Sequence, residues 1–168
     1  MLYALRLVHI LSGMFWVGTV LFTTLLLMPS LRAAGAAAGP LMAELGKRRM
    51  PVVMMGVAFL TIGSGVWLMT IASGGDMGLW MRSGTGRTFA WGGALAIVTL
   101  ALGMAINMPA ARRMAAINDA ATRRGGPPNP EEGAELQRLQ RRMAIGSQIV
   151  AILLVFATAA MAVARYVP

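Results

Sequence analysis

The chain has 168 residues, of which 57% are apolar and only 12% are charged, and it contains no cysteine. Soluble domains carry about 25% charged residues, so this composition indicates a membrane protein, and the lack of cysteine excludes disulfides, thiolate metal sites and thioether-linked haem. The net charge is +9, but the basic residues flank apolar runs and follow no nucleic-acid-reading motif. We therefore expect membrane lipids with anionic headgroups, and no nucleic acid, as partners.

Four apolar runs are long enough to cross a bilayer, which requires about 18 or more residues in a helix. Backbone groups in lipid must be satisfied within their own segment, and no run alternates apolar and polar residues as a barrel strand would. The sequence thus predicts an all-α membrane protein with four transmembrane helices in an up-down bundle, forming one domain over residues 1–168. The expected spans are about 4–29, 51–73, 88–108 and 144–166.

The first predicted helix holds His9, the only histidine, inside residues 7–31, which contain no Asp, Glu, Lys or Arg. A titratable imidazole is expensive in hydrocarbon, so its neighbours are candidates for a functional site. Gly13 and Trp16 follow at intervals of four and three residues and share a helix face with His9. Arg6 lies one turn before His9 on the same stripe.

Two interpretations of this stripe remain open. In the first, Gly13 leaves a gap for a flat macrocycle and His9 Nε2 is its axial ligand, as in a haem b site. Arg6 would then reach a propionate, and Trp16 would form a wall of the site. In the second, His9 donates one hydrogen bond to a neighbouring helix while Arg6 extends to the headgroups.

Two methionines later in the chain lie at a similar depth. At 1.5 Å per residue His9 lies about 9 Å inside its helix, while Met69 and Met161 lie about 6 and 7 Å inside theirs. Gly92 and Gly93 give the third helix a gap at this level. An imidazole with a thioether is an axial pair for haem, and one histidine with two methionines suits Cu(I). Alternatively, both belong to the flexible packing that methionine gives an apolar bundle.

The connection between the third and fourth spans is predicted to be helical up to Arg124, and residues 125–130 then break the helix. Asn129 can cap a new helix with Pro130 at its first position and two glutamates in its first turn. We expect this helix to continue into the fourth span. With the preceding helix it would form a cytoplasmic helical hairpin extension.

The basic residues outside the spans predict the orientation. Eleven lie in the first and third connections and four on the other side, so the positive-inside rule places both termini outside. The eleven are Arg32, Lys47, Arg48, Arg49, Arg112, Arg113, Arg123, Arg124, Arg138, Arg141 and Arg142. No span holds an Asp or Glu, which argues against a proton-coupled transporter.

The opening helix has a histidine, a tryptophan two turns later, then a glycine and a closing proline, here His9, Trp16, Gly18 and Pro29. This pattern resembles the first helix of copper-resistance protein D (CopD)-like proteins and small four-helix bacterial relatives. It covers about 26 residues, and the rest of the chain matches only generally, in hydropathy and in the Arg-rich lead into the last helix. The resemblance implies a bacterial inner membrane protein associated with copper or haem b. This chain lacks the second histidine of a bis-histidine haem, unless a homodimer pairs two His9 side chains.

The predicted function is therefore an integral membrane protein of CopD-like type that holds haem b or copper near the outer face. His9 would be the ligand, with Met69 or Met161 as partners. No catalytic residue is predicted, and a binding role is favoured over an enzyme. The alternative is a non-catalytic structural or accessory subunit that packs beside a larger respiratory or photosynthetic membrane complex.

Overall fold

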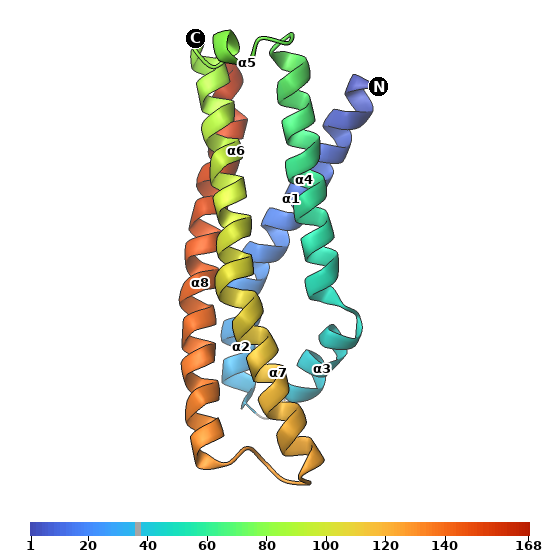
Figure 1. The fold of residues 1–168 in the computed structure, drawn as a ribbon, viewed down its shortest axis with the longest axis vertical. Helices are drawn as coiled ribbons and strands as arrows, with labels where there is room; N and C mark the ends of the chain where they lie inside the picture. The colour runs from blue at the N-terminus through green and yellow to red at the C-terminus, as the bar shows by residue number, and fades with distance from the viewer. Residues whose placement is uncertain (36–37) are drawn as a thin grey trace.

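A computed structural model describes residues 1–35 and 38–168 and is helical in almost all of this part (Figure 1). Four helices are long and apolar enough to cross a membrane, which confirms the all-helical prediction and the number of candidate spans in the described part. They extend over Leu2–Ala34, Met50–Ala72, Gly84–Arg123 and Pro130–Tyr166.

The first long helix consists of α1 (Leu2–Phe22), η1 (Thr23–Leu27) and α2 (Met28–Ala34), and the short α3 (Ala38–Lys47) leads into α4 (Met50–Ala72). After α5 (Met77–Trp80), the third consists of α6 (Gly84–Leu102), η3 (Gly103–Asn107) and α7 (Met108–Arg123). The fourth consists of α8 (Pro130–Val163) and η4 (Ala164–Tyr166). Both termini and α5 lie at one end of the molecule, and α3 and the α7–α8 connection lie at the other, which we call the Arg-rich end (Figure 1).

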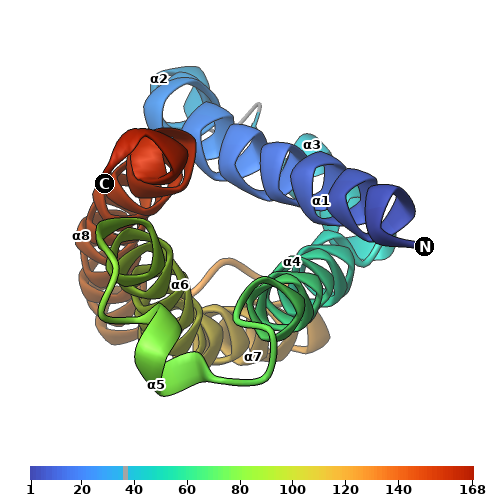
Figure 2. The ribbon, with the colours of Figure 1, turned by 90° about the horizontal axis from the view of Figure 1, so that it is seen from above.

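The long helices form two pairs. The most extensive contacts join α1 to α4 and α6 to α8, and smaller contacts join α4 to α6 and α8 to α1, which closes the ring seen from above (Figure 2). A small central cluster of Trp16, Ala58, Val150 and Leu154 connects α1, α4 and α8. Trp16 therefore belongs to the core that holds the two pairs together.

Both prolines that follow an apolar run lie inside a continuous helix. A five-residue π-helical segment, η1 or η3, directly precedes each Met-Pro pair, Met28-Pro29 and Met108-Pro109. Proline removes one backbone donor and crowds the carbonyl four residues earlier, and a wider π turn accommodates both effects. The expectation that Pro29 ends the first helix is therefore wrong, since α2 continues the helix to Ala34.

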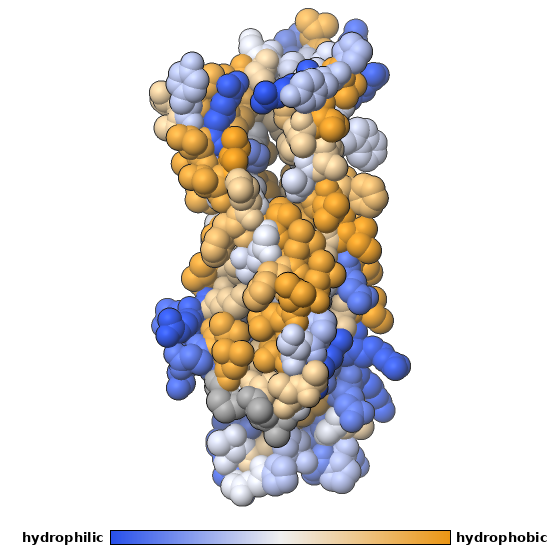
Figure 3. Space-filling view, turned by 180° about the vertical axis from the view of Figure 1, so that it is seen from behind, coloured by the Kyte–Doolittle hydropathy of each residue, from blue (hydrophilic) through white to orange (hydrophobic). Residues whose placement is uncertain are grey.

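Large apolar side chains cover the outside of the bundle. Leu11, Phe59, Trp91 and Phe156 are among many that are more than half exposed. Figure 3 shows such side chains over the middle of the molecule, with hydrophilic ones gathered toward its ends. An apolar band between polar ends is what a bilayer requires of a spanning bundle.

The Arg-rich end carries a helical pair made of α7 and the first turns of α8. Asn129 caps α8 in a capping box with Glu132, and Pro130 begins the helix, as the sequence predicts. Arg113 Nε and Nη2 donate to the two carboxylate oxygens of Glu135 at 2.7 and 3.0 Å. Arg124 Nη2 donates to Glu132 Oε2 at 2.5 Å. The two ion pairs thus join α7 to the first turns of α8, and the capping box stabilises the start of α8.

These ion pairs predict that the contact between α7 and the start of α8 depends on pH. The hydrogen bond from Arg113 lowers the pKa of Glu135, and the hydrogen bonds from Arg124 and the Asn129 backbone lower the pKa of Glu132, both below 4.5. Since the folded pKa is lowered, the stabilisation is complete above about pH 4.5 and is lost as the pH falls through the folded values. A spin label at position 118 should become more mobile as the pH falls below 4.5. Glu135→Gln should show part of that mobility at neutral pH, whereas equal mobility at every pH would contradict the prediction.

Candidate functional site

His9 lies in the contact between α1 and α4, and it is half-buried. Its Nδ1 lies 2.9 Å from the backbone oxygen of Thr61 and 3.3 Å from Ser64 Oγ. The prediction that His9 makes a hydrogen bond to a neighbouring helix is thus confirmed. The bond fixes the imidazole against α4. His9 lies in the half of the first long helix that is nearer the two chain termini (Figure 1).

The partners of His9 define its tautomer. The Thr61 carbonyl can only accept, and the hydroxyl hydrogen of Ser64 is directed to the Leu60 carbonyl at 2.6 Å, so both groups accept from His9. Nδ1 therefore carries the hydrogen and the Nε2 lone pair is free. Within residues 1–35 and 38–168, Nε2 has no hydrogen-bond partner. Metal-binding histidines commonly donate the other ring N–H to a backbone carbonyl in this way.

Gly65 gives the imidazole its position. A Cβ built at Gly65 would lie 2.8 Å from His9 Cε1, which is closer than real Cβ atoms come, and 3.2 Å from Nδ1. Only glycine permits the ring to lie directly on the backbone of α4. The close approach also brings the Thr61 carbonyl, one turn earlier on α4, within hydrogen-bond distance.

A short polar ladder continues from His9 along the same helix contact. Thr61 Oγ1 lies 2.9 Å from Ser12 Oγ, and Ser12 donates to the Val8 carbonyl at 2.6 Å. Ser12, Thr61 and Ser64 are buried, and none of them is among the residues predicted from the sequence. Their spacing gives a signal, since Ser12 follows His9 by three residues and Ser64 follows Thr61 by three. Polar side chains at such intervals share a helix face.

The other residues of the predicted stripe have different surroundings. A Cβ at Gly13 would meet the methyl group of Thr61 at 3.5 Å, so the side chain of Thr61 fills the space beside this glycine. Trp16 is 6% exposed and packs in the central cluster, two turns from His9. Arg6 is exposed. The structure thus brings His9 close to Gly65 and Thr61, and directs Trp16 to the core.

Met69 and Met161 pack on consecutive glycines of α6. A Cβ at Gly93 would lie 3.7 Å from Met69 Sδ, and a Cβ at Gly92 would lie 3.2 Å from Met161 Cε. Met69 also lies one turn beyond Gly65 on α4, and helical side chains lean toward the N-terminus of their helix. Met69 therefore lies at about the level of the His9 ring along α4, with its sulfur against α6.

Comparison with protein-family models, curated proteins and solved structures found no match to this chain. In the described part of the chain, no group of three or more His, Cys, Asp or Glu side chains could hold a metal ion. A metal ion at His9 would therefore need donors of another kind, and thioethers favour soft ions such as Cu(I).

Proposed function

We propose that the chain is an up-down transmembrane bundle in a bacterial inner membrane, with both termini outside and the α7–α8 pair extending into the cytoplasm. Eleven of the fifteen basic residues then lie on the cytoplasmic side, as the positive-inside rule requires. The anionic headgroups of that leaflet would neutralise them. His9 would lie in the outer half of the membrane.

We further propose that the chain is a CopD-like protein and binds Cu(I) through His9 Nε2, with Met69 and Met161 as thioether ligands. The observation that supports this proposal most directly is the hydrogen bond from His9 Nδ1 to the Thr61 carbonyl. This bond orients the ring and leaves the Nε2 lone pair free. The two methionines reach adjacent positions on α6, and neutral nitrogen and sulfur donors suit a soft monovalent ion. A bound ion would connect α1, α4 and α8.

Copper is favoured over haem b by the packing around the histidine. The Thr61 methyl group occupies the space beside Gly13, and the Trp16 side chain is enclosed in the core. Neither residue therefore borders a slot for a macrocycle. The thioethers of Met69 and Met161 need no such slot, since a single ion requires only donors at bonding distance.

Competition with a coloured Cu(I) chelator tests the proposal. The purified protein should retain a copper ion per chain, and X-ray absorption should show nitrogen and sulfur neighbours. His9→Ala should abolish retention, and Met69→Leu and Met161→Leu should each weaken it about tenfold or more, as loss of a supporting ligand does. Met81→Leu, at the exposed end of α5, is the matched control and should bind copper normally.

Other outcomes would overturn the copper proposal. A Soret band that disappears in His9→Ala would replace copper by haem b. A colourless protein that binds no copper and co-purifies with larger membrane subunits would indicate the accessory subunit. Equal copper affinity in Met69→Leu, Met161→Leu and Met81→Leu would remove the two methionines from the site.

A further inference from the structure

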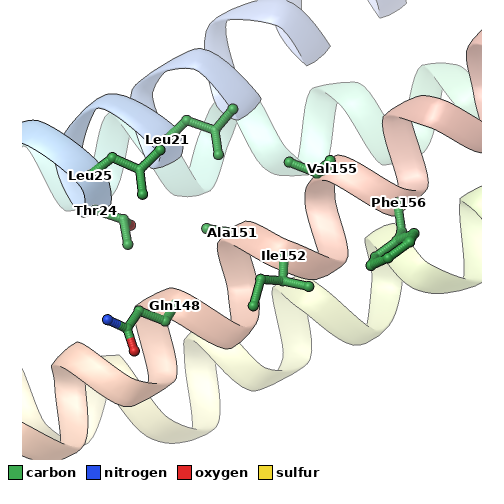
Figure 4. A pocket seen from close by; sticks show the side chains of 8 residues that line it. All are labelled: Leu21, Thr24, Leu25, Gln148, Ala151, Ile152, Val155 and Phe156. Atoms are coloured by element: carbon green, nitrogen blue, oxygen red, sulfur yellow. The ribbon is translucent and has the colours of Figure 1, made fainter.

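A groove of about 350 Å³ runs along the outside of the bundle, where the α1–η1 segment faces α8. Its first lining residue on α1, Leu21, lies twelve residues beyond His9, so the groove is separate from the candidate site. Leu21 and Leu25 form one wall, and Ala151, Ile152, Val155 and Phe156 form the other (Figure 4). The shape and lining suit a hydrocarbon chain.

The groove has two polar lining residues, and Figure 4 shows them together at one end. Thr24 and Gln148 make no hydrogen bond within the described residues, whereas Thr99 and Thr158 donate to the carbonyl four residues earlier. A polar group without a partner is costly at membrane depth. A ligand that supplies acceptors at this end of the groove would remove that cost.

Beyond the polar pair, each wall continues to an arginine at the Arg-rich end. Arg32 follows Thr24 by eight residues and Arg141 precedes Gln148 by seven, which corresponds to about 10–12 Å along a helix. Both arginines are exposed. Each wall therefore presents the same order: a positive charge, a hydrogen-bonding side chain, then hydrocarbon.

We propose that this groove is a binding site for one anionic phospholipid. An acyl chain lies in the groove, its ester carbonyls accept hydrogen bonds from Thr24 and Gln148, and the phosphate lies between Arg32 and Arg141. A phospholipid has the same order of negative charge, ester acceptors and hydrocarbon. The site is separate from His9, so this proposal does not depend on copper binding.

Native mass spectrometry of the delipidated chain tests the proposal with lipids that differ only in their headgroup. Phosphatidylglycerol should bind about tenfold more tightly than phosphatidylcholine with the same acyl chains, since each basic residue near an anionic headgroup contributes to binding. Arg32→Gln combined with Arg141→Gln should reduce phosphatidylglycerol binding to the level of phosphatidylcholine. Val155→Trp should fill the groove and weaken binding of both lipids.

Matched variants separate the site from general charge and size effects. Arg48→Gln combined with Arg49→Gln removes the same charge at the start of α4, and Val163→Trp adds the same bulk to an exposed position of α8 outside the groove. Both should bind lipid as the unchanged chain does. Equal binding of the two lipids, or unchanged phosphatidylglycerol binding in the Arg32/Arg141 variant or in Val155→Trp, would overturn the proposal.

Discussion

Gly65→Ala is expected to displace His9 from α4 and to destroy the candidate site. The added Cβ would lie 2.8 Å from Cε1 of the ring, so the imidazole must move and its bond to the Thr61 carbonyl is lost. Overpacking costs about 1–3 kcal/mol and a lost hydrogen bond about 1 kcal/mol. Copper affinity should fall about tenfold or more, because the ring loses the partner that orients Nε2. Unfolding in mixed micelles measures the loss of stability, and competition with a Cu(I) chelator measures the loss of copper affinity.

Gly63→Ala is the matched control. This residue lies two positions earlier on α4, and a Cβ there meets nothing within 4 Å, so neither stability nor copper affinity should fall. A double-mutant cycle then assigns the cause. In a His9→Ala background, Gly65→Ala should lose most of its penalty. The same penalty with and without the imidazole would show that Gly65 serves only the packing of α1 on α4.

The fold is largely predictable from the sequence because the membrane imposes strong constraints. Apolar length alone finds the four candidate spans, and the local chemistry of Asn129 and Pro130 places the start of α8 correctly. Pro29 shows the limit of such rules. A proline usually ends a helix, but whether a π turn forms before it depends on how neighbouring helices hold the chain, which a local pattern does not contain.

The candidate site is less predictable. His9 is evident because it is the only histidine in an apolar run, whereas its partners on α4 are not. The helix α4 carries apolar residues on all of its faces, so hydrophobicity does not show which face meets α1. The spacing of Thr61 and Ser64 indicates a shared face of α4, but the contact of this face and of Gly65 with His9 becomes identifiable only when the two helices are placed together.

The stripe on the first helix illustrates a related limit. His9, Gly13 and Trp16 share one face, but a helix that crosses its neighbours at an angle brings successive turns to different partners. His9 meets α4, whereas Trp16 also meets Val150 and Leu154 of α8. Residues on one face can therefore belong to two structures, here the candidate site and the core.

Trp16→Ala should lower stability more than any other single substitution proposed for this chain. Trp16 is 6% exposed and is the largest member of the central cluster. Removing a buried aromatic side chain costs about 3–5 kcal/mol when the surroundings cannot close the cavity. Closure is difficult here because Ala58, Val150 and Leu154 come from two other helices that α1 must hold together. Titration with a denaturing detergent, followed by circular dichroism, measures the loss.

Trp91→Ala is the control, since Trp91 is 69% exposed and outside the cluster. The unfolding midpoint of Trp91→Ala should stay near that of the unchanged chain. The midpoint of Trp16→Phe should lie between those of Trp16→Ala and Trp91→Ala, because phenylalanine retains an aromatic ring. The copper affinity of folded Trp16→Ala should be unchanged, since His9 is held by α4 and not by the cluster. A parallel loss of copper and stability would show that core and site are one unit, and equal midpoints for Trp16→Ala and Trp91→Ala would show that the cluster does not stabilise the bundle.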